Sequence, residues 1–166
     1  MSGLKLSSYL RNKLLDASGA SLADLLNPSA QGTLGNGSKL LIFGGPVPAG
    51  PDSATGSATL LCTIRNVTGT GSDYNLNFDT ASDGVMEKLS SDTWEGTVSN
   101  AGEMDATFFR VVTHADAGTA ADTTTYARLQ GEIATSGQVG ILSDTKLTHG
   151  GKQQIDYFSV SLPSGS

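Results

Sequence analysis

The stretch ATFFRVV, residues 106–112, decides the fold class, because it is apolar on both faces when it is written as a β-strand. Successive side chains of a strand point to opposite faces, so Phe109 and Val111 lie on one side and Phe108 and Val112 on the other. Such a strand either occupies the centre of a sheet covered on both faces, or its outer face contacts a partner. The stretch therefore predicts a β-protein with a doubly covered sheet or an apolar binding face.

Apolar residues also recur with a period of two residues on both sides of this stretch. Clusters of Gly, Pro, Asp, Asn and Ser separate the apolar runs, and each cluster favours a turn. Strands are predicted at residues 39–43, 59–64, 74–78, 85–89, 94–98, 106–112, 127–133, 139–142 and 154–162. About nine short strands suit two packed sheets. The predicted fold is mainly β: an antiparallel β-sandwich or jelly roll that forms one domain over residues 31–166, with one or two short N-terminal helices.

The first thirty residues differ from the rest of the chain. Leu6, Tyr9, Leu10, Leu14 and Ala17 recur at helical spacing, although a lysine interrupts that face. A second short helix is predicted from residue 21, where an S-x-x-D start signal occurs, to the Asn-Pro pair at residues 27–28. These features predict an N-terminal helical arm over residues 1–30.

The arm and the body carry opposite charge. Residues 1–15 hold three basic residues and no acid, a charge of +3, so a net charge of −6 leaves −9 on the rest of the chain. The arm either packs on its own domain or docks on another subunit, where leucines supply burial and cations select an acidic surface. A membrane-surface helix is disfavoured by the short, interrupted apolar face. The predicted partner-binding residues are Lys5, Leu6, Leu10, Arg11, Lys13, Leu14, Phe108 and Val112.

Several classes of ligand are disfavoured by the sequence. A pI of about 4.6 argues against direct binding of nucleic acid. Gly32 and Gly37 have the spacing of a P-loop, but Ser38 and Lys39 stand in reversed order and a predicted strand follows, so a turn into that strand is favoured. Cys62, the only cysteine, is predicted to lie in the core. We expect no cofactor.

The candidate catalytic and metal-binding residues are better explained as loop, turn and core residues. His114 and His149 lie in predicted loops, and no nucleophile elbow accompanies them. The stretch from Asp79 to Ser90 resembles a calcium loop but lacks two of its oxygen ligands, so an acidic turn is favoured. Trp94 could stack on a sugar as an exposed platform, but its strand position favours packing. The sequence predicts a protein that is neither an enzyme nor a metal protein.

The sequence contains no recognisable secretory or membrane-spanning segment. The N-terminal stretch MSGLKLSSYLRNKLLDAS lacks the uninterrupted apolar run of a secretory signal, and no later stretch has the ~18 apolar residues that span a bilayer. We expect a soluble protein that is made in the cytoplasm.

The order of the sequence segments along the chain resembles that in a group of small virion proteins of tailed bacteriophages. The resemblance rests on LRNKLLDA, LADLLN, KLLIFGGPVPAGPDSATGSATLLCTI, ATFFRVV, ARLQGEIATSGQ and QQIDYFSVSLP, and it spans roughly Leu4 to Leu162. It implies a structural virion protein: a capsid cement or decoration protein on the capsid exterior, bound to the major capsid protein and to copies of itself as a homo-oligomer. It implies no catalytic residues. The alternatives are a tail or head-to-tail component and, from another class, a glycan-binding β-sandwich module.

Overall fold

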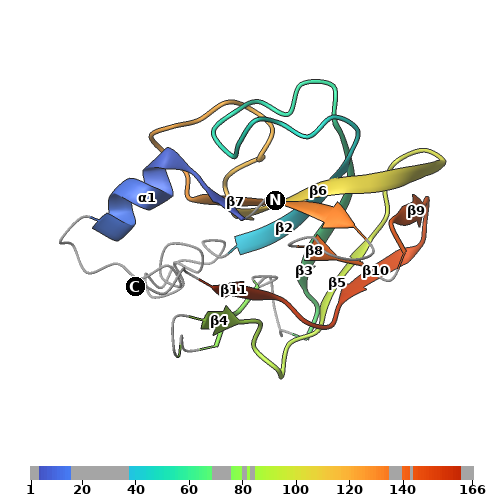
Figure 1. The fold of residues 1–166 in the computed structure, drawn as a ribbon. Helices are drawn as coiled ribbons and strands as arrows, with labels where there is room; N and C mark the ends of the chain where they lie inside the picture. Colours follow the sequence, from blue (N-terminus) through green and yellow to red (C-terminus); the bar gives the residue numbers. More distant parts are fainter. Residues whose placement is uncertain are drawn as a thin grey trace.

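The computed structural model describes residues 4–15, 38–68, 76–79, 82, 85–134, 140–142 and 144–161. These residues form a mainly β, antiparallel fold with one short helix, as the sequence predicts (Figure 1). In chain order the elements are β1 (Lys5–Leu6), α1 (Ser8–Leu15), β2 (Ser38–Gly44), β3 (Thr59–Asn66), β4 (Val85–Glu87), β5 (Trp94–Thr97), β6 (Glu103–Thr113), β7 (Arg128–Ala134), β8 (Gly140–Ile141), β9 (Lys146–Thr148), β10 (Lys152–Ile155) and β11 (Ser159–Ser161).

The main sheet has β6 in its interior. Its strands follow the order β1-β7-β6-β2-β3-β5-β10, with β8 added to β7 and β9 to β6, and this path does not close into a barrel among the described strands. Phe109 of β6 lies opposite Ile42 of β2 on one side and Gly131 of β7 on the other. All pairs are antiparallel except β7 with β8. The prediction that residues 106–112 form a central strand is therefore confirmed.

The first face of the main sheet carries the main core. Phe109 and Val111 belong to this core, together with Trp94 from β5 and Leu10 from α1. The two-stranded sheet of β4 and β11 packs on the same face, because its central residues also belong to the main core. The result is a sandwich-like arrangement of two antiparallel sheets.

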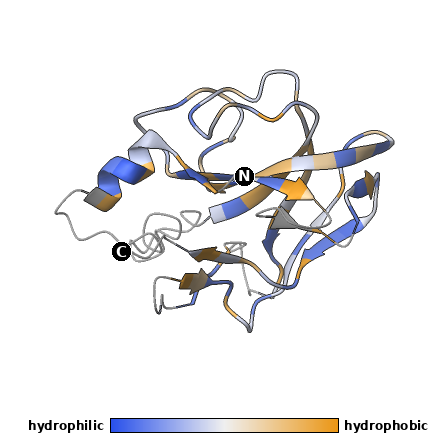
Figure 2. Ribbon diagram, viewed as in Figure 1, coloured by the Kyte–Doolittle hydropathy of each residue, from blue (hydrophilic) through white to orange (hydrophobic). Residues whose placement is uncertain are grey.

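The second face carries a smaller apolar cluster, which we call the second cluster: Leu41, Phe43, Phe108 and Val112. The rings of Phe43 and Phe108 stack with centroids 4.8 Å apart. Apolar colouring follows β2 and β6 through the middle of the sheet, whereas the outer strands are more polar (Figure 2). Phe108 and Val112 are fully buried within one chain, so their side chains are not accessible to a partner in this structure.

The N-terminal residues 4–15 are integrated into the β domain. Lys5 and Leu6 form β1, which pairs with Gln130 and Leu129 of β7 and was not predicted. The predicted first helix is confirmed as α1, and Leu10 in it is fully buried in the main core. Residues 4–15 therefore pack on their own domain, which is one of the two alternatives stated for the arm. The predicted second helix, residues 21–27, lies outside the described residues.

Most predicted strands are found close to their expected bounds, and the structure differs from the prediction at three places. The predicted strand over residues 154–162 is two strands, β10 and β11, that pair with different partners on either side of residues 156–158. β9 was missed; it pairs with the first residues of β6, Glu103–Asp105. In the described part of 74–78, Leu76 and Phe78 form only isolated bridges.

Candidate binding surface on two clamped loops

Two long loops, residues 45–58 and 114–127, cover the second cluster, and we call them the loop surface. They lie side by side beyond β2, β6 and β7 (Figure 1) and bond to each other: the Thr55 amide donates to the Thr119 carbonyl at 2.9 Å, and the Asp122 amide to the Asp52 carbonyl at 3.0 Å. Gly118 approaches the sheet so closely that a Cβ there would lie 2.6 Å from Leu41 Cδ1. The loops therefore pack directly on the sheet.

Arg110, in the middle of β6, donates hydrogen bonds to both loops. Its side chain is fully buried, and its Nη2 donates to the carbonyls of Gly50 at 3.1 Å and Ser53 at 2.8 Å. Its Nη1 donates to the Gly118 carbonyl at 2.7 Å, and its Nε to Gln130 Oε1 at 2.9 Å. One guanidinium group thus joins the sheet to both loops.

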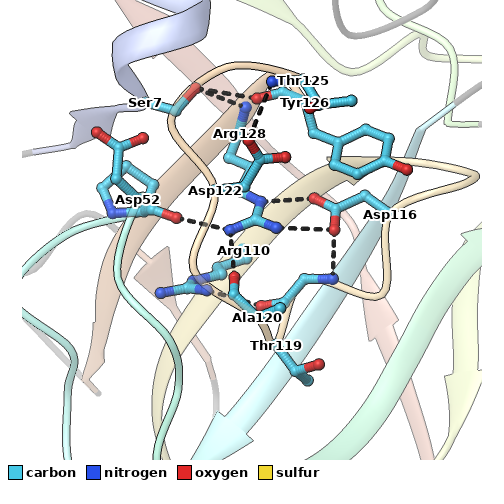
Figure 3. Close-up of polar contacts among 12 residues, drawn as sticks. Ser7, Asp52, Arg110, Asp116, Thr119, Ala120, Asp122, Thr125, Tyr126 and Arg128 are labelled. Carbon is cyan, nitrogen blue, oxygen red and sulfur yellow. Dashed lines mark hydrogen bonds and ion pairs between the residues drawn. The ribbon is translucent and has the colours of Figure 1, made fainter.

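Arg128, at the start of β7, makes a second set of such bonds. It forms a bidentate pair with Asp116, with Nε–Oδ2 at 2.6 Å and Nη2–Oδ1 at 2.9 Å. Its Nη1 donates to the carbonyls of Pro51 at 3.0 Å and Ala120 at 2.8 Å. Figure 3 shows Arg128 between Asp116 on one side and the loop backbone on the other. We call Arg110 and Arg128 the arginine clamp.

The start of α1 is tied to the same network. Ser7 is the N-cap: its Oγ accepts from the Leu10 amide at 3.2 Å and the Arg128 amide at 3.1 Å, and donates to the Tyr126 carbonyl at 3.3 Å (Figure 3). Asp52, in the first loop, accepts from the Ser8 amide at 3.0 Å and from Ser8 Oγ at 2.6 Å. A carboxylate at a helix N-terminus is electrostatically favourable.

The two arginines of the clamp are balanced by one paired carboxylate, Asp116, so the buried group has a net positive charge. Burial and the neighbouring Arg128 lower the pKa of Arg110 to about 10, while Asp116 opposes this shift. A buried charge is tolerated only when its hydrogen bonds are satisfied. The loop carbonyls accept these hydrogen bonds. The buried arginines and the loop conformation therefore stabilise each other.

The predicted partner-binding residues of the N-terminus face this surface or the main core. Lys5 Nζ donates to the Ala49 carbonyl at 2.9 Å, and Arg11 Nη2 to Ser8 Oγ at 3.0 Å. Lys13 lies over the Tyr9 ring, 5.9 Å from its centroid. Leu6 and Leu14 are partly buried against the main core, and Leu10 is fully buried in it. Lys5 and the three leucines thus contact their own domain, whereas Arg11 and Lys13 contact residues of their own helix. Phe108 and Val112 lie beneath the loops.

The other candidates from the sequence lie apart from the loop surface or inside the core. Trp94 is fully buried, which confirms packing, and Cys62 is buried with its thiol pKa raised to about 11 by desolvation. His114 and His149 are exposed, as predicted. A strand, β2, follows the P-loop-like stretch, whose glycines lie outside the described residues.

Neither a metal-binding cluster nor a membrane-spanning helix occurs among the described residues. In that part of the chain, no three His, Cys, Asp or Glu side chains gather closely enough to hold a metal ion. No helix in it is long and apolar enough to cross a membrane.

The arginine clamp was missed from the sequence, although a signal was present. Arg110 interrupts a strand that is otherwise apolar on both faces, and a charge in such a position must find buried partners. Arg128 likewise is the first residue of a largely buried strand. No protein-family model, curated protein sequence or solved structure matches this chain.

Proposed function

We propose that this protein is a structural protein of a bacteriophage virion, a decoration protein that binds the assembled capsid. The observation that carries the proposal is the loop surface held by the arginine clamp. Its first loop contains PVPAGPDSATGS, residues 46–57, which belongs to one of the two most distinctive elements of the resemblance to small phage virion proteins. The same residues that suggest the family thus form the surface through which we propose binding.

A rigid loop surface suits this role for an energetic reason. Ordering a flexible side chain or loop on association costs about 0.5–1.5 kcal/mol per immobilised side chain. The arginine clamp imposes that order before any partner arrives, because five loop carbonyls accept hydrogen bonds from Arg110 and Arg128. More of the interaction energy is then left for holding capsid subunits together.

The N-terminal residues have a different role in this proposal from the one predicted. Residues 4–15 strengthen the domain: β1 pairs with β7, and Ser7 and Ser8 bond to the loops or their flanking residues. Attachment to the capsid through Leu6, Leu10 and Leu14 is not part of the proposal, because all three pack on the main core.

The test mixes purified protein with bare, expanded capsids of the phage that encodes it, followed by sedimentation and electron microscopy. Wild-type protein should co-sediment with capsids and saturate them. Val47→Gln, in the loop surface and 39% exposed, should weaken binding, whereas Val67→Gln, after β3 and 47% exposed, should not. Protein found only on tails would instead support a tail component, and no binding to any virion part would contradict the proposal.

A further inference from the structure

Three basic residues gather beside the loop surface: Lys39 of β2, Arg65 of β3 and His114, the first residue of the second loop. We call them the basic cluster. Leu40 pairs with Ile64, so the strand register places Lys39 beside Arg65. Lys39 Nζ donates to the His114 carbonyl at 3.0 Å. Alternation along β2 puts Lys39 on the same face as Leu41 of the second cluster.

The carboxylates nearest to this cluster are already paired. Glu95 lies directly opposite Arg65 in the strand register, but its Oε1 accepts from Lys152 Nζ at 2.7 Å. Asp116 is buried against Arg128. Within the described residues, Arg65 has no hydrogen bond and no ion pair. Both carboxylates are thus paired with cations outside the cluster, and among the described residues Arg65 keeps its donors free for an anion.

The ionisation of the cluster agrees with this geometry. Burial and the Arg65 charge lower the pKa of Lys39, while the Asp116 carboxylate opposes this shift. Burial, Lys39 and Arg65 lower the pKa of His114 in the same way. These groups lie close enough to repel one another, and a bound anion would relieve that repulsion.

We infer that the basic cluster binds a carboxylate of an acidic side chain on the partner that the loop surface contacts. The inference rests on the proposed function and names the chemistry of the partner. The cluster is continuous with the loop surface through His114, so one partner can reach both. A guanidinium fork matches a carboxylate in two parallel hydrogen bonds. Three basic residues on a chain of net charge −6 do not form the extended basic surface that nucleic acid requires.

The experiment titrates the full chain with a hexaglutamate peptide at low salt and measures binding by calorimetry. Arg65→Gln and Lys39→Gln should each weaken binding by roughly tenfold. Lys146→Gln is the matched control, because it removes the same charge from an exposed residue of β9 and should leave the affinity unchanged. A thermal melt of each variant checks that it is folded.

Two results would overturn the inference. One is equal weakening by Lys146→Gln, which would show that only the overall charge matters. The other is inorganic phosphate that binds at least as tightly as hexaglutamate and displaces it, which would make the cluster a phosphate site.

Capsid binding by the same variants separates this inference from the proposed function. If wild-type protein and Arg65→Gln bind capsids equally well, the inference fails and the decoration role stands. If hexaglutamate binding depends on Arg65 but no variant and no wild-type protein binds a virion, the proposed function fails and the carboxylate site stands.

Discussion

Arg128 and Asp116 form a bidentate ion pair in which the two side chains are only 1% and 3% exposed. The pair joins the start of β7 to the second loop, and the remaining Arg128 donor reaches the first loop and Ala120. It is therefore a deeply buried connection between the sheet and the loop surface.

Removing the charge of only one partner of this ion pair should destabilise the protein strongly. Asp116→Asn removes the charge that balances Arg128, and an uncompensated buried charge costs about 3–5 kcal/mol. We expect a loss of that order in the free energy of unfolding, measured by urea denaturation. Glu103→Gln, which breaks an ion pair between side chains that are more than half exposed, should cost less than about 1 kcal/mol. Equal, small effects of the two variants would contradict the clamp.

Arg110→Met should loosen the loops without unfolding the sheet. Methionine fills much of the same volume, but it leaves the carbonyls of Gly50, Ser53 and Gly118 without their donor. Amide hydrogen exchange at Thr55 and Asp122, whose amides bond across the two loops, should accelerate by at least about tenfold. Exchange in β2 and β3 should change far less. Unchanged exchange at both loop amides would show that the loops hold together without Arg110.

Leu10→Ala tests where the N-terminal helix packs. Leu10 is fully buried in the main core, so the substitution should lower the free energy of unfolding by about 2–5 kcal/mol. Leu14→Ala, at a partly buried position on the same helix, should cost less. A Leu10→Ala protein that kept its stability but lost capsid binding would instead support an arm that docks on another subunit.

The Cys62 thiol makes stability depend on alkaline pH. Burial raises its pKa from 9.0 to about 11, so the unfolded state loses its proton first as the pH rises. The contribution of the thiol is fully present below pH 9 and is lost progressively towards pH 11. Relative to Cys62→Ala, the wild-type protein should lose about 1 kcal/mol of unfolding free energy between about pH 8 and about pH 10. A constant difference between the two proteins would contradict a desolvated thiol.

The strands that could be predicted from the sequence are those whose own residues show a clear hydrophobic pattern. β2, β3, β6 and β7 alternate or are apolar on both faces, so burial alone specifies them. β1 and β9 are short polar or mixed segments, and their pairing with β7 and β6 depends on the assembled sheet. The C-terminal break between β10 and β11 follows from their pairing with different strands, β5 and β4, which no local pattern encodes.

The candidate site was predictable only in part. Apolar residues on the outer face of β6 correctly indicated a covered surface, but the sequence could not show that the chain's own loops cover it. Nor could it show which carbonyls would satisfy Arg110, because residues 50, 53 and 118 come together only in the folded chain.

An electron cryo-microscopy reconstruction of capsids saturated with the wild-type protein tests the central claim most directly. The account predicts that residues 46–57 and 115–126 of the loop surface contact the capsid, with Arg65 within hydrogen-bonding distance of an acidic side chain. A reconstruction in which both loops point into solvent, with the capsid contacted by another face of the domain, would contradict it.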